Sequence, residues 1–126
     1  MATLTPNGDA EVVVSEQGNL KYGYTAANLG ATGTVTREYT VPTGKKWTLK
    51  AIYNSNGATI TRVLVYLSVP AVAGLHVLYD STTVFDFNVV LPQPITIPEG
   101  WVVTYQYSVG TDGNTVNSTL YQEFDA

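Results

Sequence analysis

The sequence contains no cysteine and only one histidine, His76, among its 126 residues. Without thiols the chain has no disulfide framework and no thiolate nucleophile, and a zinc site of ordinary composition lacks its ligands. A Ser–His–Asp triad would have to use His76, and no nucleophile-elbow pattern of glycines supports one. These absences argue against nucleophilic and metal-dependent catalysis. We therefore expect a protein that is not an enzyme and that holds no metal or cofactor.

Charged residues are also scarce, at 13% of the chain, against about 25% in a typical globular protein. The formal net charge is −4, so the basic face of a nucleic-acid-binding protein is missing, and we expect no nucleic-acid partner. Much of the surface must then consist of Thr, Ser, Asn, Gln and the nine tyrosines. Low charge and abundant tyrosine favour packing against copies of the chain or another protein, with an ordinary threonine-rich β-protein as the alternative.

Two further features are absent from the chain. It has no basic start followed by an apolar run, so we expect no signal peptide, no membrane span and synthesis in a cytoplasm. No segment places apolar residues at helical spacing between caps, so we predict essentially no helix.

What is present is a set of short segments with period two, each bounded by turn residues. In residues 101–109, one face carries the set Trp101, Val103, Tyr105, Tyr107 and Val109, as in a half-buried strand. A second segment of the same design places Trp47, Leu49, Ala51 and Tyr53 on one face. A Pro-x-Gly turn precedes each segment, so we interpret the two as matching elements of two halves of one β-sandwich.

The chain divides into two regions. Residues 1–33 read as an extended N-terminal arm with one or two short strands, at 11–15 and 20–25, and a glycine-rich linker at 26–33. Residues 34–126 read as a single sandwich domain with strands at 34–41, 45–54, 58–69, 75–80, 82–91, 101–109 and 115–124, and a short edge piece at 95–97 between prolines. The fold class is therefore all-β, a single-domain β-sandwich of the jelly-roll type with an arm.

The acidic residues leave one class of catalysis possible, which is glycoside hydrolysis by a pair of carboxylates. Asp80 and Asp86 flank a predicted turn, and glycoside hydrolysis needs two carboxylates about 5–10 Å apart across a cleft. Acidic residues beside a turn are more often the solvated ends of strands. The sequence Asp112-Gly113-Asn114 hints at a calcium loop, but the other ligands of such a loop are missing, and Asp-Gly favours a tight β-turn.

The aromatic residues are the best candidates for a functional surface. They could form a subunit interface or a sugar-stacking platform, although core packing competes with both interpretations. The candidate interface or ligand surface consists of Trp47, Tyr53, Trp101, Tyr105 and Tyr107.

The two Trp-led strand openings carry a resemblance. Val41-Pro42-Thr43-Gly44-Lys45-Lys46-Trp47 and Ile97-Pro98-Glu99-Gly100-Trp101, in a neutral Thr/Val/Tyr-rich chain, resemble small jelly-roll proteins of tailed-phage virions. Those proteins include capsid decoration (cement) proteins and head-fibre or tail-spike modules. The resemblance implies a virion structural protein that stabilises a phage head through protein–protein contacts. Its implied partners are other copies, favouring a homotrimer, and the major capsid protein or another virion protein.

A carbohydrate-binding β-sandwich module, with a glycan as its partner, is the alternative function. It depends on aromatic side chains being exposed, because flat rings pack against the apolar faces of sugars. The sequence does not say which tyrosines reach the surface.

Overall fold

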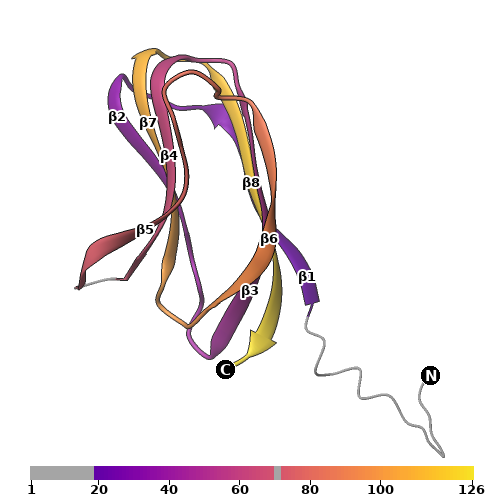
Figure 1. Cartoon of the computed structure of the whole chain (residues 1–126). Coiled ribbons are helices and arrows are strands. Elements are labelled where there is room, and N and C mark those ends of the chain that lie inside the picture. The colour runs from indigo at the N-terminus through magenta and orange to yellow at the C-terminus, as the bar shows by residue number, and fades with distance from the viewer. Residues whose placement is uncertain (1–18, 70–71) are drawn as a thin grey trace, which may run out of the picture.

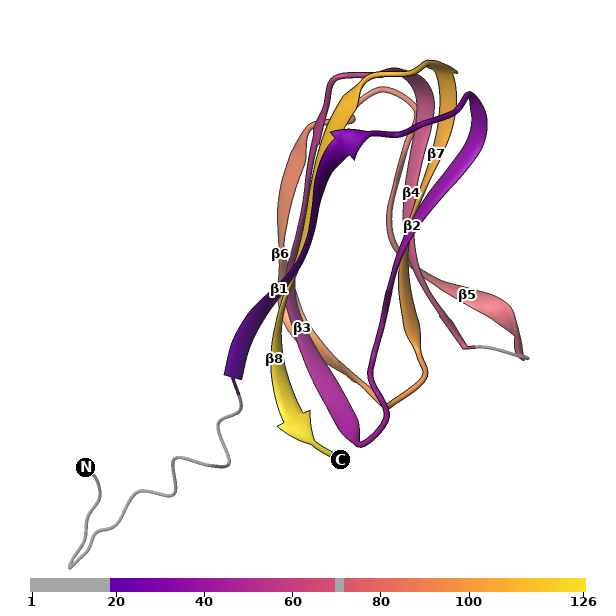
Figure 2. The same cartoon turned by 180° about the vertical axis from the view of Figure 1, so that it is seen from behind.

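The computed structural model describes residues 19–69 and 72–126, which form two antiparallel sheets packed face to face (Figure 1). The first sheet has the order β1-β8-β3-β6 and the second has the order β2-β7-β4-β5. Figure 2 shows the same two layers from behind. The strands are β1 (Asn19–Asn28), β2 (Gly33–Thr40), β3 (Lys45–Asn56), β4 (Thr59–Val69), β5 (Val72–Ser81), β6 (Phe87–Ile97), β7 (Val102–Thr111) and β8 (Asn114–Asp125).

The strand pairing has the nested pattern of a jelly roll. β1 pairs with β8, β2 with β7, β3 with β6 and β4 with β5, all antiparallel. Such nesting arises when one long antiparallel ribbon is wrapped around a core, so that its neighbouring pairs fall alternately into two sheets. The all-β jelly-roll sandwich predicted from the sequence is confirmed. No helix long and apolar enough to cross a membrane occurs in the described residues.

The core lies between the sheets and is filled by alternate residues of each strand. In β7, Val103, Tyr105 and Tyr107 are fully buried, as the period-two pattern predicts. In β3 the alternation changes at a bulge between Leu49 and Ala51. A bulge adds one residue to a strand and reverses the face of those that follow.

The two Pro-x-Gly turns lie against each other at one end of the sandwich. The Gly100 amide donates to the Val41 carbonyl, and the Val41 amide donates to the Trp101 carbonyl, both at 2.9 Å. The Gly44 amide donates to the Glu99 carboxylate at 2.7 Å. Gly44 and Gly100 have φ values of 80° and 84°, which glycine adopts without strain. The two turns that the sequence predicted to match are therefore in direct contact with each other.

The boundary predicted between arm and sandwich is wrong. β1 pairs with β8 over all ten of its residues, so residues 19–28 belong to the first sheet. The strand expected at 11–15 lies outside the described residues. β6 also differs from prediction, because it begins at Phe87 and continues to Ile97 through Pro92 and Pro94. Both prolines are tolerated because β6 is an edge strand, where one side of the backbone needs no hydrogen-bond partner.

Candidate binding surface on the first sheet

The outer face of the first sheet carries most of the exposed apolar side chains. Seven large hydrophobic residues are exposed in the described part of the chain, and two of these, Val77 and Val84, lie elsewhere. We call the other five the tyrosine face: Leu20, Tyr22, Tyr24, Tyr53 and Val90. Soluble monomers rarely gather such residues in one place unless the patch binds something.

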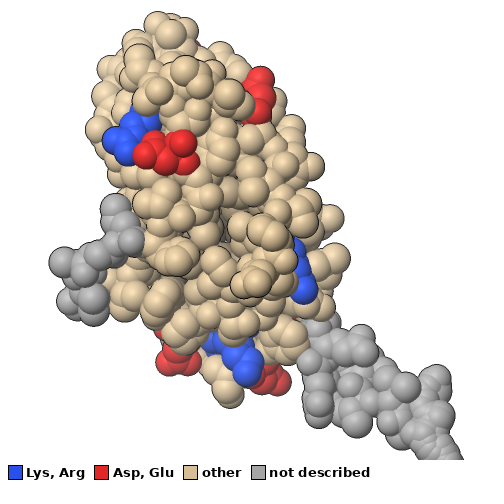
Figure 3. Space-filling model, viewed as in Figure 1, with Lys and Arg blue, Asp and Glu red and all other residues tan. Residues whose placement is uncertain are grey.

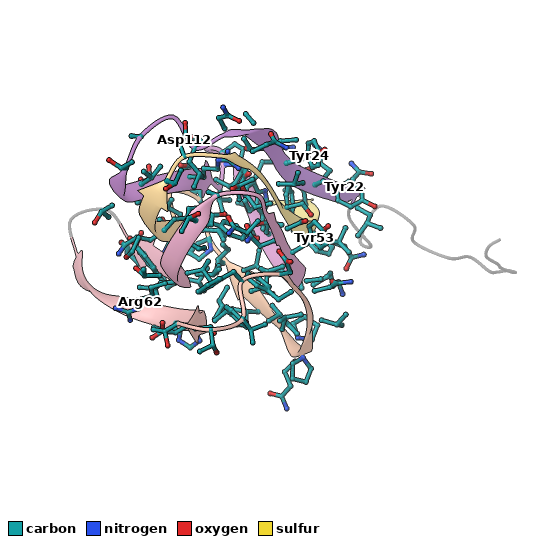
Figure 4. The ribbon with its side chains drawn as sticks, turned by 90° about the horizontal axis from the view of Figure 1, so that it is seen from above. Tyr22, Tyr24, Tyr53, Arg62 and Asp112 are labelled. Carbon is teal, nitrogen blue, oxygen red and sulfur yellow. The ribbon has the colours of Figure 1, made fainter. Side chains whose placement is uncertain are left out.

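Strand register places the three tyrosines of this face in two neighbouring rows. Tyr24 and Tyr53 are both in register with Ser118, which lies between them on β8. Tyr22 and Ala51 are likewise in register with Leu120. Adjacent strands are about 4.8 Å apart, so tyrosines on β1 and β3 lie about 10 Å from each other across β8. Figure 4 shows Tyr22, Tyr24 and Tyr53 together on one side of the molecule, away from Arg62.

The outward direction of Tyr22 and Tyr24 follows from what occupies the inner side of β1. Gly23 faces the interior, where a Cβ would lie 2.7 Å from Cδ1 of Tyr39. Thr25 forms a hydroxyl–hydroxyl hydrogen bond of 2.7 Å with Tyr39. Because the Tyr39 ring already fills this space, the small residues of β1 face inward and its tyrosines face solvent.

A shallow hollow of about 210 Å³ lies within this face. Ser118 and Ala51 are small, so the surface sinks between the larger side chains around them. Its lining consists of Tyr22, Ala51, Ile52, Tyr53, Asn88, Ser118 and Leu120. The lining combines two aromatic rings, an aliphatic floor and two neutral polar side chains, and it includes no ionisable acid or base apart from the tyrosine hydroxyls.

Charged groups stand in a few small clusters on an otherwise uncharged surface, as the view in Figure 3 shows. Lys21 pairs with Glu123 at 2.6 Å, and Glu123 also accepts the Trp47 indole N–H at 3.0 Å. These two donors hold the pKa of the Glu123 carboxyl below its usual range, Lys21 contributing most. Lys45 pairs with Asp125 at 2.7 Å in the same way. Both pairs lie outside the lining of the hollow.

The residues proposed from sequence as a candidate interface or ligand surface separate into two groups. Tyr105 and Tyr107 are fully buried and Trp47 is 4% exposed, so their assignment to an exposed interface or ligand surface is wrong. Their alternation with aliphatic residues marked a core face. Trp101 is half-buried and packs against the core. Tyr53 is exposed, and the bulge in β3 explains why it does not share the face of Trp47.

Sequence reasoning missed Tyr22 and Tyr24, which are 67% and 64% exposed. Their alternation with Lys21, Gly23 and Thr25 was a usable signal of a strand. The signal did not say which side of the strand would face solvent.

The acidic residues considered for catalysis or calcium binding are engaged in other contacts within the sandwich. His76 is exposed, and Asp80 is engaged by Arg62 through two hydrogen bonds of 2.9 and 2.8 Å. Asp86 accepts the Asn56 amide at 2.6 Å. Asp112 accepts the Gly30 and Gly113 amides, and Asp112 and Gly113 form the short connection by which the chain passes from β7 in the second sheet to β8 in the first. No group of three or more metal-ligating side chains occurs between residues 19 and 126, apart from 70–71, which are not described.

No protein-family model matches the chain. No curated protein matches it either. Among solved structures, Drosophila NLP-core is similar to 82% of this chain and 99% of its own, at 16% sequence identity and a TM-score of 0.45. That structure is described as giving insight into pentamer formation and histone binding.

Proposed function

We propose that this protein is a virion structural protein of the capsid decoration type, which stabilises a phage head through protein–protein contacts. The observation that carries the proposal is the tyrosine face, five exposed apolar side chains on one side of one sheet. A rigid sheet presents such a face with little loss of conformational entropy when a partner covers it. The partner is another virion protein, the major capsid protein first among them.

The low charge of the chain favours the same mode of action. Burying apolar area stabilises a contact by about 25 cal/mol per Å² before the costs of association, whereas burying unpaired charge opposes it. Three charged pairs form within the described residues, between Lys21 and Glu123, Lys45 and Asp125, and Arg62 and Asp80. A partner that covers the tyrosine face therefore does not have to break them.

The jelly-roll fold is compatible with the proposal and does not carry it. The same architecture serves viral capsid proteins and lectins, so the fold alone does not select a function. The proposed function therefore rests on the tyrosine face rather than on the fold. Contacts between copies are part of the proposal, and we expect a closed homo-oligomer, with a trimer favoured.

Sedimentation of labelled protein with purified phage heads tests the proposal. The chain is expected to sediment with heads from the source phage, and Tyr22→Ser combined with Tyr24→Ser is expected to reduce occupancy at least tenfold, about 1.4 kcal/mol. The control combines Val77→Ser and Val84→Ser, which removes exposed apolar groups outside the tyrosine face. Circular dichroism should show that both double variants are folded.

The proposal is overturned if the unaltered chain does not associate with heads, or if the two double variants lose occupancy equally. Light scattering of the free protein tests the contact between copies separately. A trimer that dissociates in the Tyr22/Tyr24 variant supports that contact, and a monomer in both proteins removes it from the proposal.

A further inference from the structure

The hollow in the tyrosine face has a lining that a flat, generic apolar contact does not need. Tyr22 and Tyr53 stand on opposite sides of β8, with Leu120 and Ser118 between them. Asn88 lies in register with Tyr53 on the neighbouring strand β6. The side chains of Asn88 and Ser118 form no hydrogen bond to any other described residue, so both remain available to a ligand.

We propose that this hollow binds one neutral pyranose ring of a glycan. A pyranose has an apolar face of C–H groups and a rim of hydroxyls, and the hollow offers the complement of both. The tyrosine rings and Leu120 can pack against the C–H face, while the Asn88 amide and the Ser118 hydroxyl can donate to and accept from hydroxyls at the rim.

The size of the hollow and its lack of charge narrow the range of ligands that it can bind. At about 210 Å³ it is smaller than the 300–1,000 Å³ typical of pockets for drug-sized ligands, which fits a single ring rather than an extended molecule. Its lining includes no Asp, Glu, Lys or Arg, so nothing in it compensates the charge of an acidic or amino sugar. A proline-rich peptide would need an aromatic groove several residues long.

The proposal goes beyond the function proposed above, and experiments with single variants can distinguish the two. Tyr24 and Val90 belong to the tyrosine face but not to the lining of the hollow. Asn88 belongs to the lining but contributes little apolar area. Tyr24→Ala should therefore weaken binding to heads and leave sugar binding intact, and Asn88→Ala should do the opposite. A head protein and a sugar that both occupy this face will compete for it.

Saturation-transfer NMR with the full chain and a panel of neutral methyl hexopyranosides is the direct test. At tens of millimolar, at least one glycoside is expected to receive saturation on its ring C–H protons and to shift the signals of Asn88, Ser118 and Leu120. Tyr53→Ala and Asn88→Ala are each expected to raise its Kd at least about fivefold. Tyr24→Ala and Val90→Ala serve as matched controls from the same face and should leave the Kd unchanged within twofold.

Three results would overturn the proposal. In the first, no neutral glycoside shifts the three signals. In the second, Tyr24→Ala weakens binding as much as Tyr53→Ala, which indicates a nonspecific apolar patch. In the third, a proline-rich peptide shifts these signals while every sugar fails. Because Asn88 is exposed, its substitution is expected to leave the fold intact, so an effect of Asn88→Ala on sugar binding is interpretable by itself.

Discussion

At the scale of residues, buried tyrosines bind the two sheets together through their hydroxyls. The Tyr105 hydroxyl donates to the Ser118 carbonyl at 2.6 Å, and the Tyr107 hydroxyl donates to Oδ1 of Asn54 at 2.7 Å. Both tyrosines belong to the second sheet and both acceptors to the first. The interior thus tolerates polar groups such as the fully buried Asn54 because their partners reach across the sandwich.

Burial makes these two tyrosines sensitive to alkaline pH. Loss of hydration raises the pKa of both hydroxyls well above the ordinary value of 10.0. The folded state therefore keeps its protons at a pH where the unfolded chain has lost them. The stabilisation is complete below pH 10 and falls as pH rises above it, by about 1.4 kcal/mol per pH unit for each tyrosine. Denaturant unfolding between pH 8 and pH 11 should show this loss.

The variant Tyr107→Phe isolates one of the two groups. It leaves Asn54 Oδ1 without its donor, so we expect a loss of about 1–3 kcal/mol at neutral pH. Above pH 10 the stability of this variant should fall less steeply than that of the unaltered chain, because one of the two titrating groups is gone. Equal slopes in the two proteins would contradict the assignment of the alkaline transition to Tyr107. Tyr22→Phe, at an exposed tyrosine, is the control and should leave both quantities unchanged.

At the scale of elements, local chemistry predicted turns and alternation well and long-range pairing poorly. The Pro-x-Gly turns and the alternation of β7 are properties of adjacent residues. The run of small residues from Ala26 to Gly33 looked like a linker, yet its first three residues complete β1, because β8 at the other end of the chain supplies their hydrogen bonds. Pairing of this kind leaves no local signature.

The candidate site was only partly predictable for the same reason. The exposure of Tyr53 depends on a bulge in β3, and no glycine or proline marks that bulge in the sequence. The exposure of Tyr22 depends on Gly23 facing the Tyr39 ring, which comes from a strand of the other sheet. A pattern of alternating aromatic residues locates the strand, but the residues packed on its inner side decide which face is exposed.

The turns themselves give a prediction at this scale. Gly100 has a φ of 84° and no heavy atom within 4 Å of an added Cβ, so Gly100→Ala tests backbone strain without a steric clash. We expect it to destabilise the protein by about 1 kcal/mol in denaturant unfolding. Gly110→Ala is the matched control, because Gly110 lacks a positive φ and its added Cβ would make only ordinary contacts. Equal stability of the two variants would show that the Pro98–Gly100 turn does not require a glycine.

At the scale of the whole molecule, the nested pairing makes the fold depend on both ends of the chain. The innermost pair, β4 and β5, is joined by a short connection, whereas β1 and β8 come from opposite ends of the described chain. The tyrosine face spans β1, β3 and β6, so it exists only when the outermost pair has formed. The surface proposed to bind partners is therefore assembled from segments that are distant in the sequence.

This topology predicts slow folding in which β1 docks late. Proteins dominated by long-range strand pairs fold in milliseconds to seconds. The chain loses conformational entropy when it closes long loops, and it gains the stabilising strand contacts only afterwards. Trp47, stacked on Tyr121 with ring centroids 3.9 Å apart, reports on the pairing of β3 with β8. Stopped-flow refolding followed by tryptophan fluorescence should therefore show a main phase in that range.

Two substitutions test the order of events. Thr25→Ala removes the hydrogen bond from β1 to Tyr39 and should cost about 1 kcal/mol, expressed almost entirely as faster unfolding if β1 docks after the transition state. Val65→Ala, in the fully buried centre of β4, should cost about 2 kcal/mol and also slow folding, because β4 belongs to the inner pair. If Thr25→Ala slows folding in proportion to its loss of stability, β1 is already paired in the transition state. The ends of the chain would then meet first, and the tyrosine face would form with the nucleus rather than after it.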